Sequence, residues 1–201
     1  TREDFCAHGL PDDLIVGDLT GVSEALASLA RRETYRESLQ CVSAIDGRHR
    51  LIGQQLAPYF SEAALHHHRI IVEVEHLLTL DTLFPGEILR RLSHDEQERL
   101  RAIASGFTVH DAFAVLEYDH LGRDGFGPSE HDVKACERWL SKRLVDEGLA
   151  DIAPLVHVFL TSEDVNNLAY KGMLAEAVTE IFGPSVTQIM ERLAELAEAH
   201  S

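Results

Sequence analysis

The sequence predicts an all-α protein, and three observations support this prediction. Apolar residues recur at spacings of three and four positions along most of the chain, as they do on one face of a helix. Several of these stretches begin with a Ser or Thr that is followed closely by an acidic residue, which is typical of a helix start. No stretch shows a convincing strand pattern of alternating apolar and polar residues.

The composition is that of a folded globular protein, and it argues against some classes of partner. With 201 residues and 45% hydrophobic content, the chain can form one substantial domain, or one domain and part of another. The 34 acidic and 18 basic residues give a net charge of −16, which argues against nucleic acid or an anionic membrane as the main partner. A small anionic substrate is compatible with this charge if basic residues gather locally.

The cysteines and the N-terminal residues predict a cytoplasmic location. Cys6, Cys41 and Cys136 are odd in number and widely separated, so they indicate a reducing compartment, with neither a disulfide framework nor a zinc site. The first residues lack the apolar core of a signal peptide, and no apolar run approaches the length that spans a membrane.

The first half of the chain should contain several helices. We expect one over about residues 20–40 and another that starts at Ser61 and runs to about residue 80. The second has a buried stripe formed by Ile70, Ile71, Val74, Leu77 and Leu78. Pro85 should open a helix to about residue 92, and Ser93 with Glu96 forms a capping box for the next helix, which continues over residues 108–118.

In the second half, three glycines and a proline over residues 121–128 predict a loop. A helix follows from residues 129–132 to about residue 145, and another covers about residues 164–181. Gly183 and Pro184 should bend or interrupt this last helix, because proline removes a backbone donor and clashes with the preceding turn. The apolar stripe then continues almost to the end of the chain.

Residues 161–167 are the most informative stretch, a helix start that could also bind an anion. Thr161 and Ser162 can cap the helix with their hydroxyls, and Glu163 and Asp164 lie in the first turn, where negative charge suits the helix dipole. Backbone N–H groups and two adjacent hydroxyls also make such a turn a binder of carboxylate or phosphate. An ordinary capped helix is the alternative, and the spacing alone favours it.

Three consecutive histidines, His66, His67 and His68, are the first of four candidate sites. Consecutive residues on a helix point about 100° apart, so the three rings cannot bind one metal ion. Partners four positions further on would be needed, and these positions hold Ile71 and Val72. We therefore expect a partly exposed helix face and no metal site.

Arg48, His49 and Arg50 follow an Asp-Gly turn and form the second candidate. The guanidinium group is a planar fork that suits phosphate or carboxylate, although a solvated basic turn explains the same residues equally well.

His131 and Asp132 are the third candidate. The N-terminus of a helix lowers a histidine's affinity for a proton and leaves the ring available for proton exchange with a substrate, and Asp132 could orient the ring. Ser129 with Asp132 also fits a plain capping pair. His157, the fourth candidate, lies four residues before Thr161 and could line the same pocket, although a lone histidine in an apolar run is usually a core residue.

Three segments follow one another in an informative order: Ser43-Ala44-Ile45-Asp46-Gly47-Arg48-His49, His131-Asp132-Val133-Lys134-Ala135 and Thr161-Ser162-Glu163-Asp164-Val165-Asn166-Asn167. Between the first two lie Phe60-Ser61-Glu62-Ala63-Ala64-Leu65 and Ile71-Val72-Glu73-Val74-Glu75. From about residue 40 onward, this order and spacing resemble the N-terminal part of the adenylosuccinate lyases, a purine-biosynthesis family of the fumarase/aspartase superfamily. The motif over residues 161–167 is shared by other families of the superfamily, whereas Asp-Gly-Arg together with His-Asp-Val-Lys-Ala points to the adenylosuccinate lyases.

The resemblance implies a lyase that works by β-elimination without a metal or an organic cofactor. A base removes a proton from the succinyl group of adenylosuccinate, or of the related succinyl-carboxamide ribotide, and an acid protonates the leaving nitrogen. Fumarate is then released, and the other product from adenylosuccinate is AMP. Both substrates carry a phosphate and two carboxylates, which suits the anion-binding features of the sequence.

By the same resemblance, eight residues bind the substrate: Arg48, His49, Glu130, His131, Asp132, His157, Thr161 and Ser162. The first two would hold the phosphate end, and His131 would lie close to the chemistry. Thr161 and Ser162 would bind a succinyl carboxylate at the helix N-terminus, and His157 matches a histidine that contacts substrate in some members.

Some positions depart from the family pattern. The usual Arg-Tyr is Arg48-His49 here, and the usual Thr-Asn before His-Asp is Ser129-Glu130. Glu130 brings a negative charge beside a trianionic substrate, which should weaken binding unless the side chain points away. The family's Thr-His-Gly-Gln-Pro-Ala segment with the acid histidine, and its loop with the base serine, are not in these 201 residues. We therefore expect this chain by itself to have no lyase activity.

The resemblance divides the chain into three parts: an extension over residues 1–40, an N-terminal helical lyase domain over residues 41–160, and the start of a central helical bundle over residues 161–201. The last part would be the first long helix of that bundle. Family members are homotetramers whose sites are assembled from three subunits. The apolar face of the terminal helix, which needs a partner, fits such an assembly.

Two other functions stay open. A non-enzymatic helical module could keep the scaffold and use the terminal helix for assembly. The second alternative is another lyase of the superfamily, such as an argininosuccinate lyase or an aspartate ammonia-lyase. Arg48 after Asp-Gly and the segment that begins with His131 argue against this second alternative, whereas Glu130 keeps it open.

Overall fold

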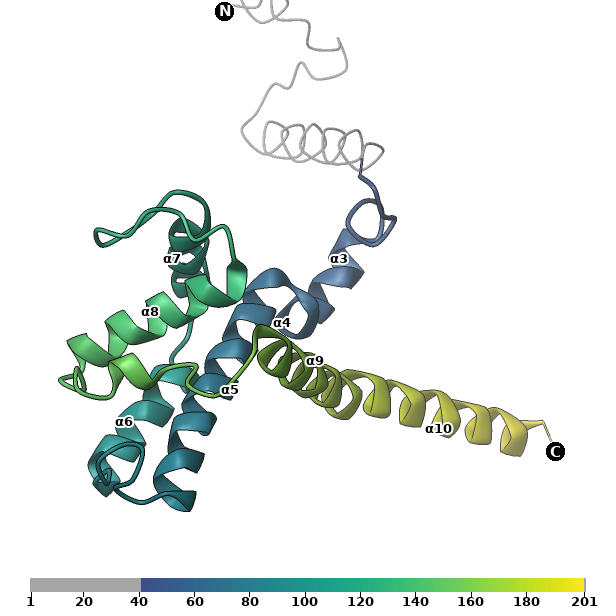
Figure 1. Cartoon of the computed structure of the whole chain (residues 1–201). Coiled ribbons are helices and arrows are strands. Elements are labelled where there is room, and N and C mark those ends of the chain that lie inside the picture. The colour runs from purple at the N-terminus through teal and green to yellow at the C-terminus, as the bar shows by residue number, and fades with distance from the viewer. Residues whose placement is uncertain (1–40, 201) are drawn as a thin grey trace, which may run out of the picture. The chain divides into compact units, whose positions relative to one another are not determined.

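The computed structural model describes residues 41–200, and over this range the protein is all-α, as the sequence predicts (Figure 1). Extended pairing within these residues is limited to two isolated bridges, Pro85 with Leu89 and Arg123 with Phe126. The helix predicted over residues 20–40 lies outside the described range. The chain divides into two compact units between Gln55 and Leu56, and each unit is described separately.

Residues 41–55 are the described part of the first unit. The predicted Asp-Gly turn is present, because the backbone N–H of Gly47 donates to Ser43 O at 3.0 Å and that of His49 donates to Ala44 O at 2.9 Å. The short helix α3 (Arg50–Gly53) follows, and the 3₁₀ turn η2 (Gln54–Leu56) comes next.

The second unit is built around α5 (Glu62–Leu83), which packs against α4 (Ala57–Phe60), α6 (His94–Ser105), α7 (Val109–His120), α8 (Asp132–Asp146) and α9 (Ser162–Ala177). Ser61 caps α5 by accepting the N–H of Ala64 at 3.2 Å, as its sequence predicts. The predicted stripe is confirmed, with Ile71 half-buried and the others fully buried in one core with residues of α6, α7 and α8.

The expectation of a partly exposed face at the three histidines is wrong for His66 and His68, which are 2% and 4% exposed. Because other helices pack around α5, its polar side is also covered. His66 Nδ1 lies 3.5 Å from the thiol of Cys136 on α8, and His68 donates through Nδ1 to Ala64 O at 2.9 Å. His67 is half-buried and stacks on Phe107.

The helix predicted from Pro85 to residue 92 is also wrong. This segment consists of turns, because Gly86 has a φ of 80°, which a right-handed helix cannot contain. Leu92 instead donates its N–H to Asp81 on α5 at 3.0 Å. The predicted capping box of Ser93 and Glu96 is confirmed at the start of α6, and residues 108–118 belong to the separate helix α7, which has a capping box of its own.

The predicted loop over residues 121–128 is present, and the 3₁₀ turn η3 (Ala153–Leu155) follows α8. The chain then forms α9, the π-helical segment η4 (Val178–Phe182) and α10 (Gly183–Ala199), which Figure 1 shows as one long rod. The predicted interruption is this π segment, in which Gly183 donates to Val178 O. The wider turn relieves the clash of Pro184 with the preceding turn and accommodates its missing N–H.

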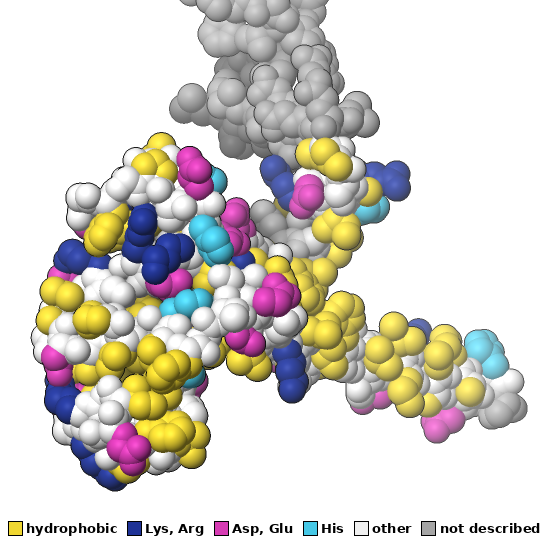
Figure 2. Space-filling view, viewed as in Figure 1, with side chains coloured by type: hydrophobic (Ala, Val, Ile, Leu, Met, Phe, Trp, Pro, Cys, Tyr) yellow, Lys and Arg dark blue, Asp and Glu magenta, His cyan; other side chains and the backbone are white. Residues whose placement is uncertain are grey.

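The long rod is buried only at its start. Val165, Ala169, Met173 and Ala177 of α9 are buried, whereas α10 has no buried residue. Figure 2 shows apolar side chains along α10, and the exposed ones are Val186, Ile189, Met190, Leu193 and Leu196. None of the helices described between residues 41 and 200 combines the length and apolar character that a membrane crossing requires.

Candidate functional site

The start of α9 is a capping box between Thr161 and Asp164. The Thr161 hydroxyl accepts the N–H of Asp164 at 3.3 Å, and the Asp164 carboxylate accepts the N–H of Thr161 at 2.8 Å and its O–H at 2.7 Å. These hydrogen bonds hold the pKa of Asp164 below its usual value. Thr161 thus caps the helix, and the hydroxyl of Ser162, the first helical residue, does not take part in the cap.

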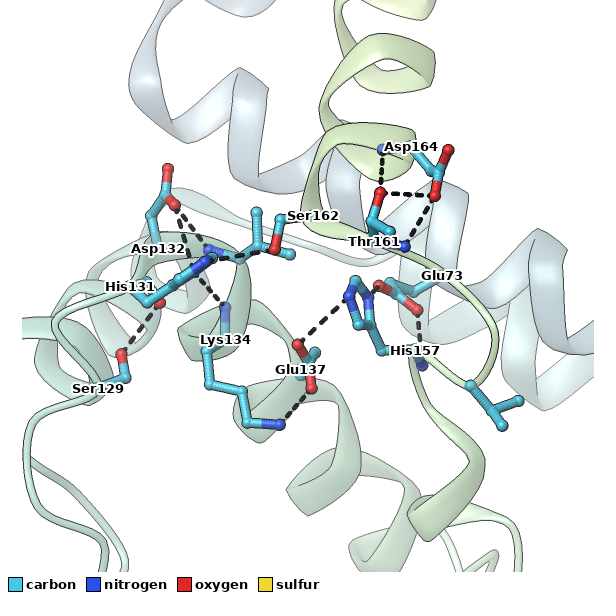
Figure 3. Close-up of polar contacts among 12 residues, drawn as sticks. Glu73, Ser129, His131, Asp132, Lys134, Glu137, His157, Thr161, Ser162 and Asp164 are labelled. Carbon is cyan, nitrogen blue, oxygen red and sulfur yellow. Dashed lines mark hydrogen bonds and ion pairs between the residues drawn. The ribbon is translucent and has the colours of Figure 1, made fainter.

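His131 at the start of α8 contacts Ser162 at the start of α9 (Figure 3). His131 is the N-cap of α8, and its Nδ1 accepts the N–H of Lys134 at 3.3 Å. In the neutral ring this places the proton on Nε2, which lies 3.3 Å from Ser162 Oγ and donates to it. The N-termini of α8 and α9 therefore face each other at this contact, where the positive ends of two helix dipoles favour a negative charge.

The predicted capping pair of Ser129 and Asp132 is wrong, because His131 caps α8 instead. The hydroxyl of Ser129 contacts Asp119 Oδ1 and His131 O, each at 3.1 Å, and the N–H of His131 donates to the same Asp119 oxygen at 2.7 Å. These bonds fix the end of the loop against α7 and set the backbone of His131.

Asp132 is held by Arg69 and does not orient the His131 ring by a hydrogen bond. Its Oδ2 accepts from Arg69 Nη2 at 2.5 Å and its Oδ1 accepts the N–H of Val133 at 2.8 Å, while Oδ1 lies 3.8 Å from His131 Nδ1. Burial alone would raise the pKa of Asp132, but the hydrogen bond and charge of Arg69 outweigh burial and lower it.

His157 lies between two carboxylates (Figure 3). Its Nδ1 donates to Glu73 Oε1 at 2.5 Å, its backbone N–H donates to Glu73 Oε2 at 2.9 Å, and its Nε2 is 3.7 Å from Glu137 Oε1. Glu137 in turn accepts from Lys134 Nζ at 2.6 Å. Burial raises the pKa of the fully buried Glu73, and the hydrogen bonds from His157 oppose that rise.

The segment that joins His157 to α9 is strained. His157 and Phe159 both have a φ of 65°, in the left-handed region that is uncommon for residues other than glycine and least favourable for a bulky residue such as Phe159. Glu73 binds both the ring and the backbone of His157, so it holds this conformation in place. The strained segment leads directly to Thr161, and its shape therefore sets where α9 begins.

Three predicted site residues remain, namely Glu130 in the second unit and Arg48 and His49 in the first unit, which is described separately. Glu130 is exposed, has a φ of 50° and donates its N–H to Asp119 O at 3.1 Å. Arg48 and His49 are exposed residues of the first unit. The structure thus brings together His131, Asp132, Thr161 and Ser162, with His157 on the segment that leads to them.

Sequence reasoning missed four residues around this site: Arg69, Glu73, Lys134 and Glu137. Two of them could have been recognised from the sequence. Arg69 and Glu73 are charged residues four positions apart within the apolar part of α5, so they share one face of the helix. A cavity of about 580 Å³ lies along α8 and is lined partly by Lys134 and Glu137, but His131 and Ser162 do not line it. Among the described residues no cluster of His, Cys, Asp or Glu is arranged to hold a metal ion.

Comparison with known proteins identifies relatives of the chain. No family model matches it. The adenylosuccinate lyase of Legionella pneumophila (strain Corby) is 32% identical over 168 residues, which cover 82% of this chain and 35% of the relative. The adenylosuccinate lyases of Dictyostelium discoideum and Escherichia coli (strain K12) are each 30% identical, over 165 and 161 residues, covering 80% of this chain and 34% of each relative.

The chain spans about a third of the length of these curated relatives. The matched share of the chain agrees with the motifs that begin near residue 40. The predicted resemblance is confirmed: this chain is a partial homologue of the adenylosuccinate lyases.

Proposed function

We propose that the complete protein containing this chain is an adenylosuccinate lyase, and that this chain supplies the corner of the active site that binds a succinyl carboxylate. The observation that carries the proposal is the convergence of two helix N-termini, where His131 Nε2 lies 3.3 Å from Ser162 Oγ. The names of the relatives support the reaction class, and the geometry supports the role of this corner.

The chemistry of β-elimination explains why such a corner is useful. Removal of a proton from the carbon next to a carboxylate moves negative charge onto the carboxylate oxygens before the C–N bond breaks. Backbone N–H groups at a helix N-terminus, the hydroxyl of Ser162 and an N–H of His131 all favour negative charge there. Because the neighbouring helices already fix these donors, they need little reorganisation when the charge develops.

Other residues take the roles that the resemblance implies. Arg48 and His49 would bind the phosphate end of adenylosuccinate or of the succinyl-carboxamide ribotide, and His157 would contact the substrate. The acid histidine and the base serine of the reaction are not in these 201 residues, so the chain alone is proposed to be inactive. The proposed reaction uses no cofactor, and its place is the cytoplasm.

Assembly belongs to the same proposal. The rod formed by α9, η4 and α10 exposes a row of large apolar side chains, namely Leu168, Tyr170, Leu174, Val178, Phe182, Val186, Ile189, Met190, Leu193 and Leu196. Exposed apolar rows of this length indicate a protein interface. We propose that they pack against the same rods of other copies in a homotetramer.

Fumarate release from adenylosuccinate by the complete protein tests the proposed function. Steady-state release that produces one AMP for each fumarate would support it, and the 201-residue chain assayed alone should be inactive. Release of fumarate from argininosuccinate or aspartate, but not from adenylosuccinate, would assign the protein to another lyase of the superfamily. A complete protein that is folded but releases fumarate from none of these substrates would contradict the proposal.

A further inference from the structure

We propose that Arg69 is a positioning residue, which ties the start of α8 to the start of α9 and thereby sets the distance between His131 and Ser162. This inference rests on the proposed function, because it concerns how the carboxylate-binding corner is held. Arg69 contacts neither of the two residues that it would position.

The contacts of Arg69 reach both helices from a third one. Arg69 lies on α5 and is 2% exposed. Its Nη2 donates to Asp132 Oδ2 at 2.5 Å, and its Nε donates to Asn166 Oδ1 at 3.0 Å. Asp132 is the residue after His131, and Asn166 is one helical turn after Ser162. A single guanidinium group therefore connects the first turns of the two helices that form the corner.

The packing of the helices makes this connection important. Both α8 and α9 pack extensively on α5, whereas they have few contacts with each other. Their relative position is therefore set through α5, and Arg69 is a side chain of α5 that binds both of them near the corner. The third guanidinium nitrogen, Nη1, lies 3.4 Å from His66 Nδ1, which also belongs to α5.

The shape of the guanidinium group suits this task better than an ammonium group would. Its N–H donors point in fixed directions within one plane, so bonds to Asp132 and Asn166 fix the angle between their helices as well as the distance. A lysine at this position keeps the charge but cannot make both bonds in the same geometry. The charge-preserving change Arg69→Lys therefore removes the fork while leaving a cation to pair with Asp132.

The test compares Arg69→Lys with Arg99→Lys in the complete protein. Arg99 is a matched control because its partly buried guanidinium donates to Glu147 O and pairs with Asp95, and it lies on α6, outside the corner. The measurements are kcat and KM for adenylosuccinate, the affinities for fumarate and AMP, and the ¹³C and ¹⁵N chemical shifts of the His131 ring. These shifts report on the surroundings of the ring whether or not the protein is a lyase.

We expect Arg69→Lys to lower kcat/KM by about tenfold to a hundredfold. Fumarate affinity should fall while AMP affinity changes less than about twofold, and the His131 signals should move. Arg99→Lys should leave kinetics, affinities and signals unchanged. If Arg69→Lys does not fold, Asn166→Ala, which removes only the bond to α9, takes its place and should show the same pattern.

Unchanged His131 signals together with unchanged fumarate affinity in the folded variant would overturn the inference. An equal loss of AMP and fumarate affinity would also overturn it, because a general loss of structure affects both ligands. If the wild-type protein releases no fumarate, the proposed function fails. In that case, His131 signals that move in Arg69→Lys but not in Arg99→Lys would still support the positioning role.

Discussion

Four polar residues of α5 are buried, although such side chains usually face water. His66, His68, Arg69 and Glu73 are each less than 5% exposed. Arg69 and Glu73 are bound by partners on other helices or segments, as buried charges require. His66 is less well satisfied, because its Nε2 has no hydrogen-bond partner within the described structure. The burial of His66 makes the stability of the protein sensitive to pH.

Burial, together with the nearby charge of Arg69, lowers the pKa of His66 below its usual value of 6.5. The unfolded chain therefore binds a proton more readily than the folded protein, so the contribution of His66 to stability is present above pH 6.5 and is lost as the pH falls through the folded pKa. We expect the free energy of unfolding to decrease between pH 7 and pH 5 for this reason.

Urea unfolding of the wild type and of His66→Gln across this pH range measures the effect. Gln keeps a polar side chain of similar reach but does not titrate, so the stability difference between wild type and variant should depend on pH. A difference that stays constant from pH 7 to pH 5 would show that His66 does not contribute to the pH dependence.

At the scale of secondary-structure elements, the contact between α5 and α9 depends on a glycine. Gly172 lies on α9 where a Cβ atom would come within 2.9 Å of His68 Cδ2. The His68 ring cannot move away easily, because it is buried and its Nδ1 is bonded to Ala64 O. Close approach of the two helices thus requires a residue without a side chain at position 172.

Gly172→Ala should consequently destabilise the protein. Helix propensity alone favours alanine by about 1 kcal/mol. The clash with His68 should cost about 2–3 kcal/mol, which leaves a net loss of about 1–2 kcal/mol. Gly127→Ala is the control, because nothing lies within 4 Å of a Cβ at that position. Thermal unfolding of both variants provides the comparison, and a Gly172→Ala protein as stable as the wild type would disprove the close packing.

Helix starts could be predicted from the sequence because capping is a local interaction. The start of α6 is recognisable from Ser93 and Glu96, and the start of α9 from Thr161 and the acidic residues after it. In each capping box the two side chains lie only three positions apart. The helix predicted from Pro85 is absent because Gly86 has a φ of 80°, which belongs to a turn. A proline favours both a helix start and a turn, so it could not distinguish the two. The capping of α8 by His131 was missed since Ser129 is the commoner kind of N-cap residue.

The candidate site was predictable only in part for a related reason. His131 and Ser162 lie at recognisable helix starts, so their sequence neighbours identify them. The partners of Arg69 and Glu73 are 63 to 97 residues away along the chain, and no local pattern indicates such a pairing. The burial of His66 likewise depends on helices that pack around α5 from distant parts of the sequence.

In the complete protein, we propose that the exposed apolar side of α10 packs against other copies of the chain. Leu193→Glu should weaken this assembly, because it places a charge in the middle of the apolar row, where Leu193 is 61% exposed in the single chain. Light scattering of the complete protein should show a smaller species for this variant. Glu191→Gln changes an exposed polar residue of the same helix and should leave the oligomer intact.

An unchanged molecular mass for Leu193→Glu would contradict the assignment of this face to assembly. The same result would also remove the main structural support for a site shared between subunits. The proposed carboxylate-binding corner does not depend on this outcome, since His131, Asp132, Thr161 and Ser162 belong to one chain.

The proposed binding of the substrate's carboxylate end by the start of α9 can be measured by calorimetric titration of the complete protein with fumarate and with AMP. In Ser162→Ala, loss of a hydrogen bond to a charged group should weaken fumarate binding by about 10- to 100-fold, while AMP affinity stays nearly constant. Ser162→Thr, which keeps a hydroxyl, is the control and should retain most of the fumarate affinity. Equal losses for fumarate and AMP, or no loss of fumarate affinity in Ser162→Ala, would contradict this proposed binding.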